Sequence, residues 1–324
     1  MDASISEMDL IFSLLEEENF EAANKLVCVK KEVASKVDPV SGLPVIFQAV
    51  QNEALALSVL ERAEASASFV DPVRGVLPLH VACKESTAKV VSELLHVNPS
   101  AVLVRDKEGH TPLYYACQNR NSKETLQILD LLLGCTGHTK TKEHNDGVTR
   151  GKGKGRASKA VAAAMAARDG TQLVTAISSG TEEFIDGITP LHHAARAGSC
   201  GEVINLLLKY FPTAVDIPEK GSHRMPLHLA ACSNAPEDCL MALVDAHPAA
   251  LSKKDVHGFT PMALATKHRM SPKGLRVLFQ SAEMRDGVQE EEKATLLHNA
   301  IQNGASKAEL STLLELVPDG ALLP

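Results

Sequence analysis

One seven-residue pattern returns along most of this 324-residue chain and limits what the chain can fold into. Its copies are Leu43–Ala49 (a weaker one), Leu77–Cys83, Thr111–Cys117, Thr189–Ala195, Met225–Ala231, Thr260–Thr266 and Thr295–Ile301. The position that usually holds proline recurs after 34, 34, 78, 36, 35 and 35 residues. A period in this range is typical of repeat architectures, in which each unit buries its apolar face only against its neighbours. The sequence therefore predicts a stack of about seven units rather than one globular core.

The letters of the pattern predict a short helix. Three copies begin with threonine and proline, as in Thr189 and Pro190. A threonine oxygen can accept a hydrogen bond from a free N–H of the first helical turn, and proline at the first helical position loses no hydrogen bond. Leucine and alanine follow at helical spacing, as in Leu191 and Ala194. The small alanine lets neighbouring helices approach closely.

Glycine and aspartate precede these helices and predict tight turns with positive φ. The glycines are Gly42, Gly75, Gly109, Gly187, Gly221 and Gly258. Counted from Gly221, the turn before Pro226 is predicted to be two residues longer than usual. A second helix is expected after each motif helix, because apolar residues recur there at helical spacing. The expected ranges are 89–97, 123–133, 202–210, 238–246, 273–279 and 308–317. A proline should stop most of them, at Pro99, Pro212, Pro248 and Pro318.

The repeated segments resemble the T-P-L-H-x-A signature of ankyrin repeats. The resemblance implies an all-α solenoid of helix–turn–helix units with β-turn fingers, and a repeated histidine that bridges adjacent turns by hydrogen bonds. Two copies depart from the signature. Ala263 replaces the histidine, and the last copy has Leu296 in place of proline, with Glu290–Glu292 lengthening its approach. These departures bear on the regularity of the last two units.

Four segments follow from this pattern. Residues 1–40 are predicted to form an N-terminal capping helix pair, with helices at about 7–17 and 19–29. Residues 41–134 are expected to hold three repeats. Residues 135–183 are a basic, Gly/Ala-rich insertion, expected to be mostly disordered. Residues 184–324 are expected to hold four repeats, the last one degenerate.

The insertion is where an anion would bind. Its basic residues include Arg150, Lys152, Lys154, Arg156 and Lys159. The spacing of its glycines fails the phosphate-binding P-loop pattern twice, because three residues separate Gly147 from Gly151 and Gly153 follows Lys152. A flexible basic loop explains the composition. Docking to nucleic acid, to an acidic protein face or to the nuclear import machinery stays open.

Composition narrows the class of protein. The formal net charge is −7, whereas a general nucleic-acid binder is expected to be basic. No positively charged leader precedes an apolar run, and no apolar run approaches the ~18 residues of a membrane span. The seven cysteines show no Cys-x-x-Cys pair, which favours reduced thiols in the cytoplasm or nucleus. We expect a monomer there.

Catalytic and metal chemistry find little support. His192 and His193 are adjacent on a helix, so their side chains diverge by about 100° and chelate one ion poorly. Cys83 and Cys117 occupy a position where alanine is usual and are expected to be small core residues. No Ser/His/Asp arrangement has a characteristic spacing. The chain is therefore not expected to be an enzyme, and no cofactor or metal is expected.

The chain is expected to act as a protein-interaction scaffold or adaptor, with its partner bound on the concave side of the stack. Candidate contacts are positions that vary between copies at equivalent exposed places. They are Val73, Arg74, Lys84, Lys107, Glu108, His110, Gln118, Asp186, Ile188, Arg196, His257, Phe259 and Lys267. Ile188 and Phe259 are expected to be exposed and to act as apolar anchors. The alternative is a nucleic-acid or anionic-surface binder that acts through residues 150–159.

Overall fold

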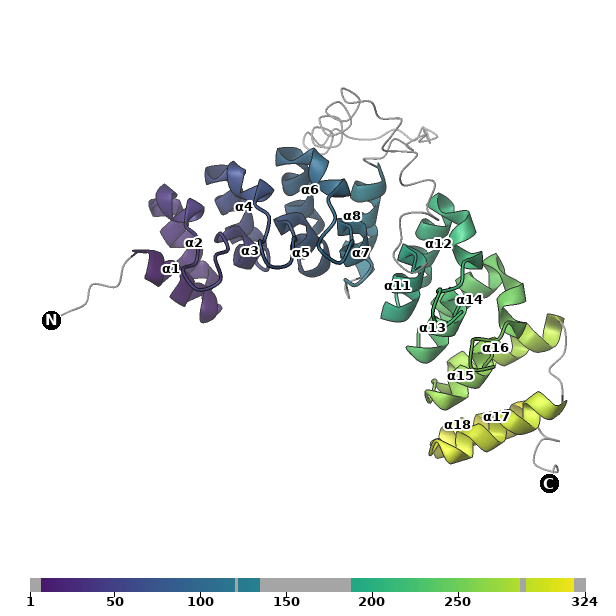
Figure 1. The fold of residues 1–324 in the computed structure, drawn as a ribbon. Coiled ribbons are helices and arrows are strands. Elements are labelled where there is room, and N and C mark those ends of the chain that lie inside the picture. The colour runs from purple at the N-terminus through teal and green to yellow at the C-terminus, as the bar shows by residue number, and fades with distance from the viewer. Residues whose placement is uncertain (1–6, 120–121, 135–187, 286–289, 318–324) are drawn as a thin grey trace, which may run out of the picture. The chain divides into compact units, whose positions relative to one another are not determined.

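The computed structural model of the chain consists of helices stacked in pairs (Figure 1). It describes residues 7–119, 122–134, 188–285 and 290–317. The chain divides into two compact units, Met1–Ile177 (unit 1) and Ser178–Pro324 (unit 2). Within the described ranges, extended pairing is limited to an isolated antiparallel bridge between Val37 and Pro44. The expected all-α repeat stack is therefore confirmed, whereas the predicted insertion lies outside the described residues.

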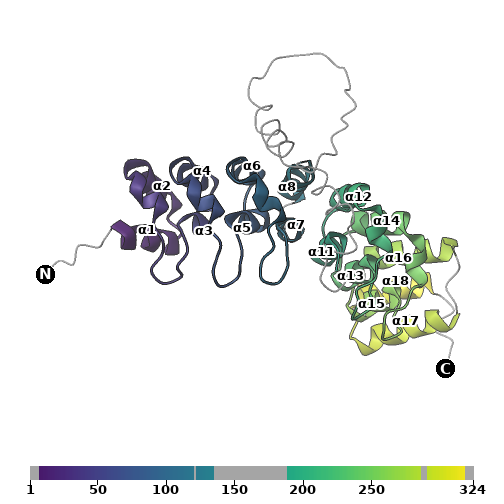
Figure 2. The same cartoon turned by 45° about the horizontal axis from the view of Figure 1, so that its top comes forward.

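The described residues of unit 1 form four helix pairs. Its elements are α1 (Glu7–Glu16), α2 (Phe20–Val29), η1 (Lys31–Ser35), α3 (Ile46–Ala49), α4 (Glu53–Arg62), η2 (Glu64–Ser68), α5 (Pro78–Glu85), α6 (Ala88–Val97), η3 (Pro99–Leu103), α7 (Pro112–Ala116) and α8 (Ser122–Gly134). The inner helices α1, α3, α5 and α7 form one row and the outer helices α2, α4, α6 and α8 form the other (Figure 2). Each outer helix packs against the next outer helix.

Unit 2 repeats this arrangement. Its elements are α11 (Pro190–Ala197), α12 (Gly201–Tyr210), η5 (Pro212–Asp216), α13 (Pro226–Cys232), α14 (Glu237–Ala246), η6 (Pro248–Ser252), α15 (Pro261–Lys267), α16 (Pro272–Arg285), α17 (Glu290–Gln302) and α18 (Lys307–Leu316). The inner helices are α11, α13, α15 and α17, and the outer helices are α12, α14, α16 and α18. Both rows pack helix to helix along the unit.

Small residues set the spacing between repeats. Leu191, Ala194 and Ala195 on α11 are almost fully buried. At the start of α12, the backbone N–H of Gly201 donates to a carboxylate oxygen of Asp238 at 2.6 Å. A Cβ atom on Gly201 would lie 2.6 Å from the backbone oxygen of Asp238. Only glycine therefore allows outer helices α12 and α14 to approach this closely.

The predicted threonine caps are confirmed at Thr189 and Thr260, whereas Thr111 makes no side-chain cap hydrogen bond although α7 begins at Pro112. Thr189 and Thr260 accept hydrogen bonds from the backbone N–H groups of His192 and Ala263, at 3.4 and 3.2 Å. The proline that follows each of them is the first helical residue. The weak first copy differs, because α3 begins two residues after Pro44.

The last inner helix corrects one expectation. Residues 290–292 do not lengthen the approach to the last copy, because α17 already begins at Glu290. Leu296 stands where the other copies have proline, so its N–H is available and the helix extends through this position toward its N-terminus. The preceding outer helix, α16, also runs past residue 279 to Arg285.

A short 3-10 helix follows several outer helices, whether or not a proline stands there. The prolines at 99, 212 and 248 each begin a short 3-10 helix after the outer helix ends. The same 3-10 turn follows α2 and α4 without proline. Pro318, the fourth expected exit, lies outside the described residues.

The turns from inner to outer helix in unit 2 share one backbone conformation. Gly198, Asn234, Arg269 and Gly304 occupy the same place in successive repeats, with φ of 70°, 55°, 58° and 68°. Glu18, between α1 and α2, has φ of 55° as well. The N-terminal helices, expected at about 7–17 and 19–29, therefore turn into one another as a repeat does.

Candidate functional site

Five loops of the described part of the chain, which we call fingers, each precede an inner helix. They are finger 1 (residues 36–45), finger 2 (69–77), finger 3 (104–111), finger 4 (217–225) and finger 5 (253–260). Figure 2 shows the three fingers of unit 1 as loops that extend beyond the row of inner helices. Together with the inner helices, the fingers are the surface on which a partner is expected.

A buried acidic residue organises most fingers. In finger 3, one carboxylate oxygen of Asp106 accepts the backbone N–H groups of Glu108 and His110, at 2.9 and 2.8 Å. In finger 5, Asp255 accepts those of His257 and Phe259, at 2.9 and 3.0 Å. Burial alone would raise the pKa of Asp255, but these hydrogen bonds and the Arg224 guanidinium outweigh burial and lower it. Each fingertip is therefore held rigidly from inside.

Neighbouring fingers are joined through their backbones. The N–H of Lys107, one residue after the finger acid, donates to the carbonyl of Arg74 in finger 2 at 3.0 Å. Val256 in finger 5 donates in the same way to Ser222 in finger 4, also at 3.0 Å. Finger 2 has Pro72 at this position, and proline has no N–H to donate. Finger 2 therefore cannot be joined to finger 1 by this bond.

Finger 4 corrects the prediction based on Gly221. The residue with positive φ is His223, at 54°, and its N–H donates to the Glu219 carbonyl at 2.8 Å. Gly75 has the same role in finger 2, with φ of 76° and a bond to the carbonyl of Asp71. Finger 4 therefore has the length of finger 2, and the expected two-residue extension is wrong.

Two of the repeated histidines, His80 and His228, tie their inner helices to the next finger, as expected, whereas the buried Nε2 atom of His192 has no hydrogen-bond partner among the described residues. The Nδ1 atom of His80 accepts the N–H of Leu77, and its Nε2 atom lies 3.0 Å from the carbonyl oxygen of Val104. Since Nδ1 accepts, Nε2 carries the proton and donates. Burial lowers the pKa of His80, and it lowers the pKa of His192 to about 4. These imidazoles are neutral parts of the scaffold, and His193 is buried too.

The predicted contact residues of finger 2 and α5 are exposed but partly engaged. Val73 is 74% exposed. Arg74 donates from Nε to Asp71 at 3.0 Å, which fixes the guanidinium over its own finger. On α5, the Lys84 ammonium lies 3.5 Å from the carboxylate of Glu85, and both side chains are exposed.

Finger 3 gathers the other predicted contacts of unit 1. Lys107 donates from Nζ to the carbonyl of Pro72 at 2.6 Å. His110 stacks on Tyr114, with 3.7 Å between ring centroids, and lies 3.4 Å from the exposed Glu108 carboxylate. Gln118, at the end of α7, is half-buried. The structure thus brings Lys107, Glu108 and His110 together.

In unit 2, Arg196 and Lys267 reach toward the fingers. Arg196 forms an ion pair with the buried Glu219 of finger 4 at 2.5 Å. The Lys267 ammonium lies 4.5 Å from the ring centroid of Phe259, within the range of a cation–π contact. His257 is exposed at the tip of finger 5.

The apolar anchors are less exposed than expected. Ile188 and Phe259 are both half-buried, Phe259 being partly covered by Lys267. Asp186 and the basic run 150–159, with Arg150, Lys152, Lys154, Arg156 and Lys159, lie outside the described residues.

Sequence reasoning missed several basic residues of this surface. They are Lys220, Arg224, Lys253, Lys254 and Arg269. Two of them were hidden by the choice of Gly221 as the turn glycine, which shifted the register of finger 4. Alignment on the finger acids places Lys220 directly after the acid and Arg224 two residues before the helix.

One group could hold a metal ion by geometry alone. Asp106, Glu108 and His110 offer ligand atoms within 4.8 Å of one another. The second carboxylate oxygen of Asp106 accepts the Tyr115 hydroxyl at 2.7 Å, and the first accepts two finger N–H groups. These bonds account for the position of Asp106 within the finger.

The buried thiols are poor nucleophiles. Cys83 and Cys117 are fully buried, as expected for core residues. Burial raises the pKa of Cys117 to about 12 and raises that of Cys83 further. Both therefore stay protonated at neutral pH, when a thiolate would be needed for reaction.

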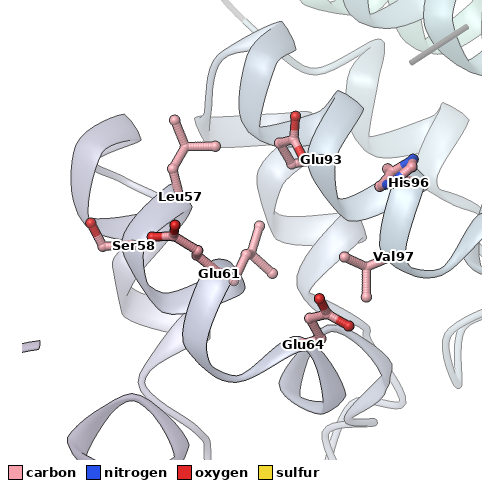
Figure 3. Close-up of a pocket in the computed structure, with 8 residues that line it drawn as sticks. Leu57, Ser58, Glu61, Glu64, Glu93, His96 and Val97 are labelled. Atoms are coloured by element: carbon pink, nitrogen blue, oxygen red, sulfur yellow. The ribbon is translucent and has the colours of Figure 1, made fainter. Parts of the chain in front are cut away.

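A groove of about 380 Å³ lies on the opposite side of unit 1, between outer helices α4 and α6. Figure 3 shows the carboxylates of Glu61, Glu64 and Glu93 around it. Ser58 and His96 also line it, from different helices, with no hydrogen bond between them in the described part of the chain. None of the predicted contact residues lines this groove.

Two rows of helices with fingers joined from repeat to repeat define a helical repeat protein of the interaction type. A family model for ankyrin repeats in three copies matches residues 46–143 and 161–250, more than half of the chain. The chain belongs to the ankyrin repeat family. Ankyrin repeats generally mediate protein–protein interactions. The basic run 150–159 falls between the two matched ranges.

A human relative is similar over a short stretch. Transient receptor potential cation channel subfamily A member 1 is 39% identical over 88 residues, which are 27% of this chain and 8% of the channel. The chain therefore spans a small part of that relative's length. Among the described residues, no helix of this chain combines the length and the apolar character needed to cross a membrane.

Proposed function

We propose that this chain is a protein-binding scaffold that holds its partner on the fingers and inner helices. The observation that carries the proposal is the contrast between rigid finger backbones and exposed tips. Asp38 and Asp71 fix their fingers by accepting the backbone N–H groups of Val40 and Val73, at 3.0 and 2.7 Å, whereas the side chains of these two valines at the tips are 93% and 74% exposed. A preorganised surface loses little conformational entropy when it binds.

The same contrast favours binding over catalysis. Two of the recurring buried histidines, His80 and His228, are committed to backbone hydrogen bonds at both ring nitrogens. The buried thiols are protonated. These side chains are thus occupied in the scaffold, and we propose no enzymatic activity. The chain would work as a monomer in the cytoplasm or nucleus.

A charge swap at one fingertip tests the proposal. The variant Lys107→Glu with Glu108→Lys keeps net charge and composition but reverses the order of two exposed side chains. The control is Glu21→Lys with Lys25→Glu, which swaps an exposed pair on outer helix α2, 2.6 Å apart in the structure. Partners of the full-length chain are captured by affinity purification with cross-linking and mass spectrometry.

We expect partners cross-linked to the fingers to be depleted at least tenfold in the fingertip variant and retained by the control. Circular dichroism must show that both variants fold. Cross-links that fall on the outer helices, with equal recovery from both variants, would reject the fingers as the binding surface.

The alternative, an anionic ligand bound through residues 150–159, rests on the composition of the insertion. Deleting residues 135–183 tests it directly. Loss of retention on heparin would favour the alternative, whereas unchanged retention would reject it.

A further inference from the structure

The finger side of unit 2 carries an excess of positive charge. We define the basic face as fingers 4 and 5 with α11, α13, α15 and the turns that follow these helices. It holds seven basic side chains, Arg196, Lys220, Arg224, Lys253, Lys254, Lys267 and Arg269. Glu219 and Asp255 are the acidic residues described there, and both are buried. In unit 1, fingers 1–3 with α3, α5, α7 and the described turns that follow these helices hold five basic and five acidic residues. The excess of positive charge therefore belongs to unit 2.

The acids of the basic face are already paired. Glu219 forms an ion pair with Arg196, and Asp255 forms one with Nε of Arg224 at 3.1 Å. The carboxylate of Asp255 is fully buried, which shields it from any incoming ligand. These pairs fix Arg196 and Arg224, and Arg269 lies 3.9 Å from the carboxylate of Glu309 on α18. The lysines have no such counter-charge among the described residues.

Four lysines remain exposed and form no ion pair among the described residues. They are Lys220 in finger 4, Lys253 and Lys254 in finger 5, and Lys267 on α15. The cation–π contact with Phe259 orients Lys267 but does not neutralise it. Unneutralised ammonium groups therefore occur on two neighbouring fingers and on an inner helix.

The charges of successive repeats converge on one place. Burial raises the pKa of Cys232 at the end of α13; Arg224, Lys267 and Arg196 lower it, whereas Asp255 raises it. The three basic residues come from three successive repeats. All three therefore lie near enough to this thiol to affect its pKa.

Backbone strain supports a functional reading. Arg269 has φ of 58° at the inner-to-outer turn where two other repeats of unit 2 have Gly198 and Gly304. His223 has φ of 54° where finger 2 has Gly75. A side chain in the left-handed region costs free energy, and such costs cluster at functional sites. Here a basic residue and a histidine stand where glycine would be easier.

We infer that the basic face binds an acidic segment of a partner protein, rich in aspartate and glutamate side chains. This rests on the proposed function and names the chemistry of the partner. Single carboxylates can meet each spaced lysine, and electrostatic attraction acts over ~8 Å at physiological salt. A long polyphosphate fits less well, because it would extend beyond the basic face over the rest of a chain whose net charge is −7, whereas a short acidic segment can stay on the basic face.

A labelled twelve-residue poly-glutamate peptide serves as the probe for the full-length chain. The test variant is Lys254→Glu with Lys267→Glu, on the basic face. The control is Lys209→Glu with Lys273→Glu, which makes the same change on the outer helices α12 and α16 of the same unit. Fluorescence anisotropy gives the affinities at 50 and 300 mM salt.

A third variant removes the charge of the insertion, with Arg150, Lys152, Lys154, Arg156 and Lys159 all changed to glutamine. We expect at least a tenfold loss of peptide affinity in the test variant and less than a threefold change in the control and the insertion variant. Higher salt should weaken binding to the wild-type chain severalfold.

Three results would overturn the inference. They are equal losses in the test and control variants, a loss confined to the insertion variant, and tighter binding of a twelve-nucleotide poly-dT probe than of the peptide. The proposed function is judged separately, by cross-linked partners. If cellular partners still cross-link to the fingers in the Lys254→Glu/Lys267→Glu variant, the scaffold function stands and the acidic partner does not.

Discussion

The Nε2 atom of His228 lies 3.1 Å from the carbonyl oxygen of Lys253, the first residue of finger 5. The Nδ1 atom of the same ring accepts the backbone N–H of Met225 at 3.2 Å, at the start of α13. One imidazole therefore joins the start of an inner helix to the finger of the next repeat. Because repeats contact only their neighbours, such links decide how cooperatively the stack folds.

Replacing His228 with alanine should destabilise unit 2 by about 3 kcal/mol. The change leaves the Met225 N–H and the Lys253 carbonyl without partners in a buried place, and each unsatisfied group costs about 1–3 kcal/mol. Urea unfolding followed by circular dichroism measures the loss. The matched control is His257→Ala at the exposed tip of finger 5, which should change stability by less than about 0.5 kcal/mol. Equal effects of the two changes would contradict this role for His228.

Stability should fall as the pH decreases from about 6.5 toward 4. Burial lowers the pKa of His80, His192 and His228, that of His192 to about 4. Below pH 6.5 the unfolded chain therefore binds protons that the folded chain rejects, which favours unfolding. For His192 alone the shift corresponds to about 3 kcal/mol. Urea midpoints measured between pH 7.5 and 4.5 should decrease steadily.

The finger carboxylates do not account for this loss. The pKa of Asp71 and that of Asp255 are lowered on folding, so these groups stabilise the chain above about pH 4 and lose that contribution only in stronger acid. A His192→Gln variant should be less stable at neutral pH but show a flatter pH dependence. An unchanged slope in this variant would show that His192 does not carry the effect.

How far the sequence predicted the fold depends on which residues repeat. Thr189, Pro190 and His192 recur in register, so the helix starts and the bridging histidines were visible. The start of α17 at Glu290 was not predicted, because no residue there marks a helix start and the helix extends only because Leu296 replaces proline. The site was harder still. The role of His223 in finger 4 depends on its positive φ, which the histidine side chain gives no reason to expect.

The pairing of charges was also beyond the sequence. Arg196 and Glu219 are 23 residues apart and meet because α11 packs beside finger 4. Arg224 and Asp255 meet across two fingers in the same way. The sequence does not show these ion pairs, so it cannot distinguish a neutralised arginine such as Arg224 from an unneutralised lysine such as Lys254.

Gly75 and Gly42 offer a matched pair for the finger backbone. Both lie in a D-P-V-x-G sequence and have positive φ, at 76° and 71°. A Cβ atom on Gly75 would lie 3.0 Å from the backbone nitrogen of Lys107, whereas one on Gly42 meets nothing within 4 Å. We expect Gly42→Ala to cost about 1 kcal/mol, from φ alone, and Gly75→Ala about 2–3 kcal/mol. Urea unfolding should separate the two variants; equal losses would mean that finger 3 can shift away.

Arg269 should show a trade-off between stability and binding. Its φ of 58° is disfavoured for a residue with a side chain, and Gly198 and Gly304 occupy the same place in other repeats. Relief of this backbone conformation in Arg269→Gly should exceed the small loss of the 3.9 Å ion pair with Glu309, so unit 2 should gain about 0.5 kcal/mol in urea unfolding. It should also weaken binding of the poly-glutamate peptide severalfold, because one cation leaves the basic face. Asn234→Gly is the control, since it relieves the same backbone conformation, with φ of 55°, without removing a charge. A gain in stability with unchanged peptide affinity in Arg269→Gly would separate this arginine from the binding surface.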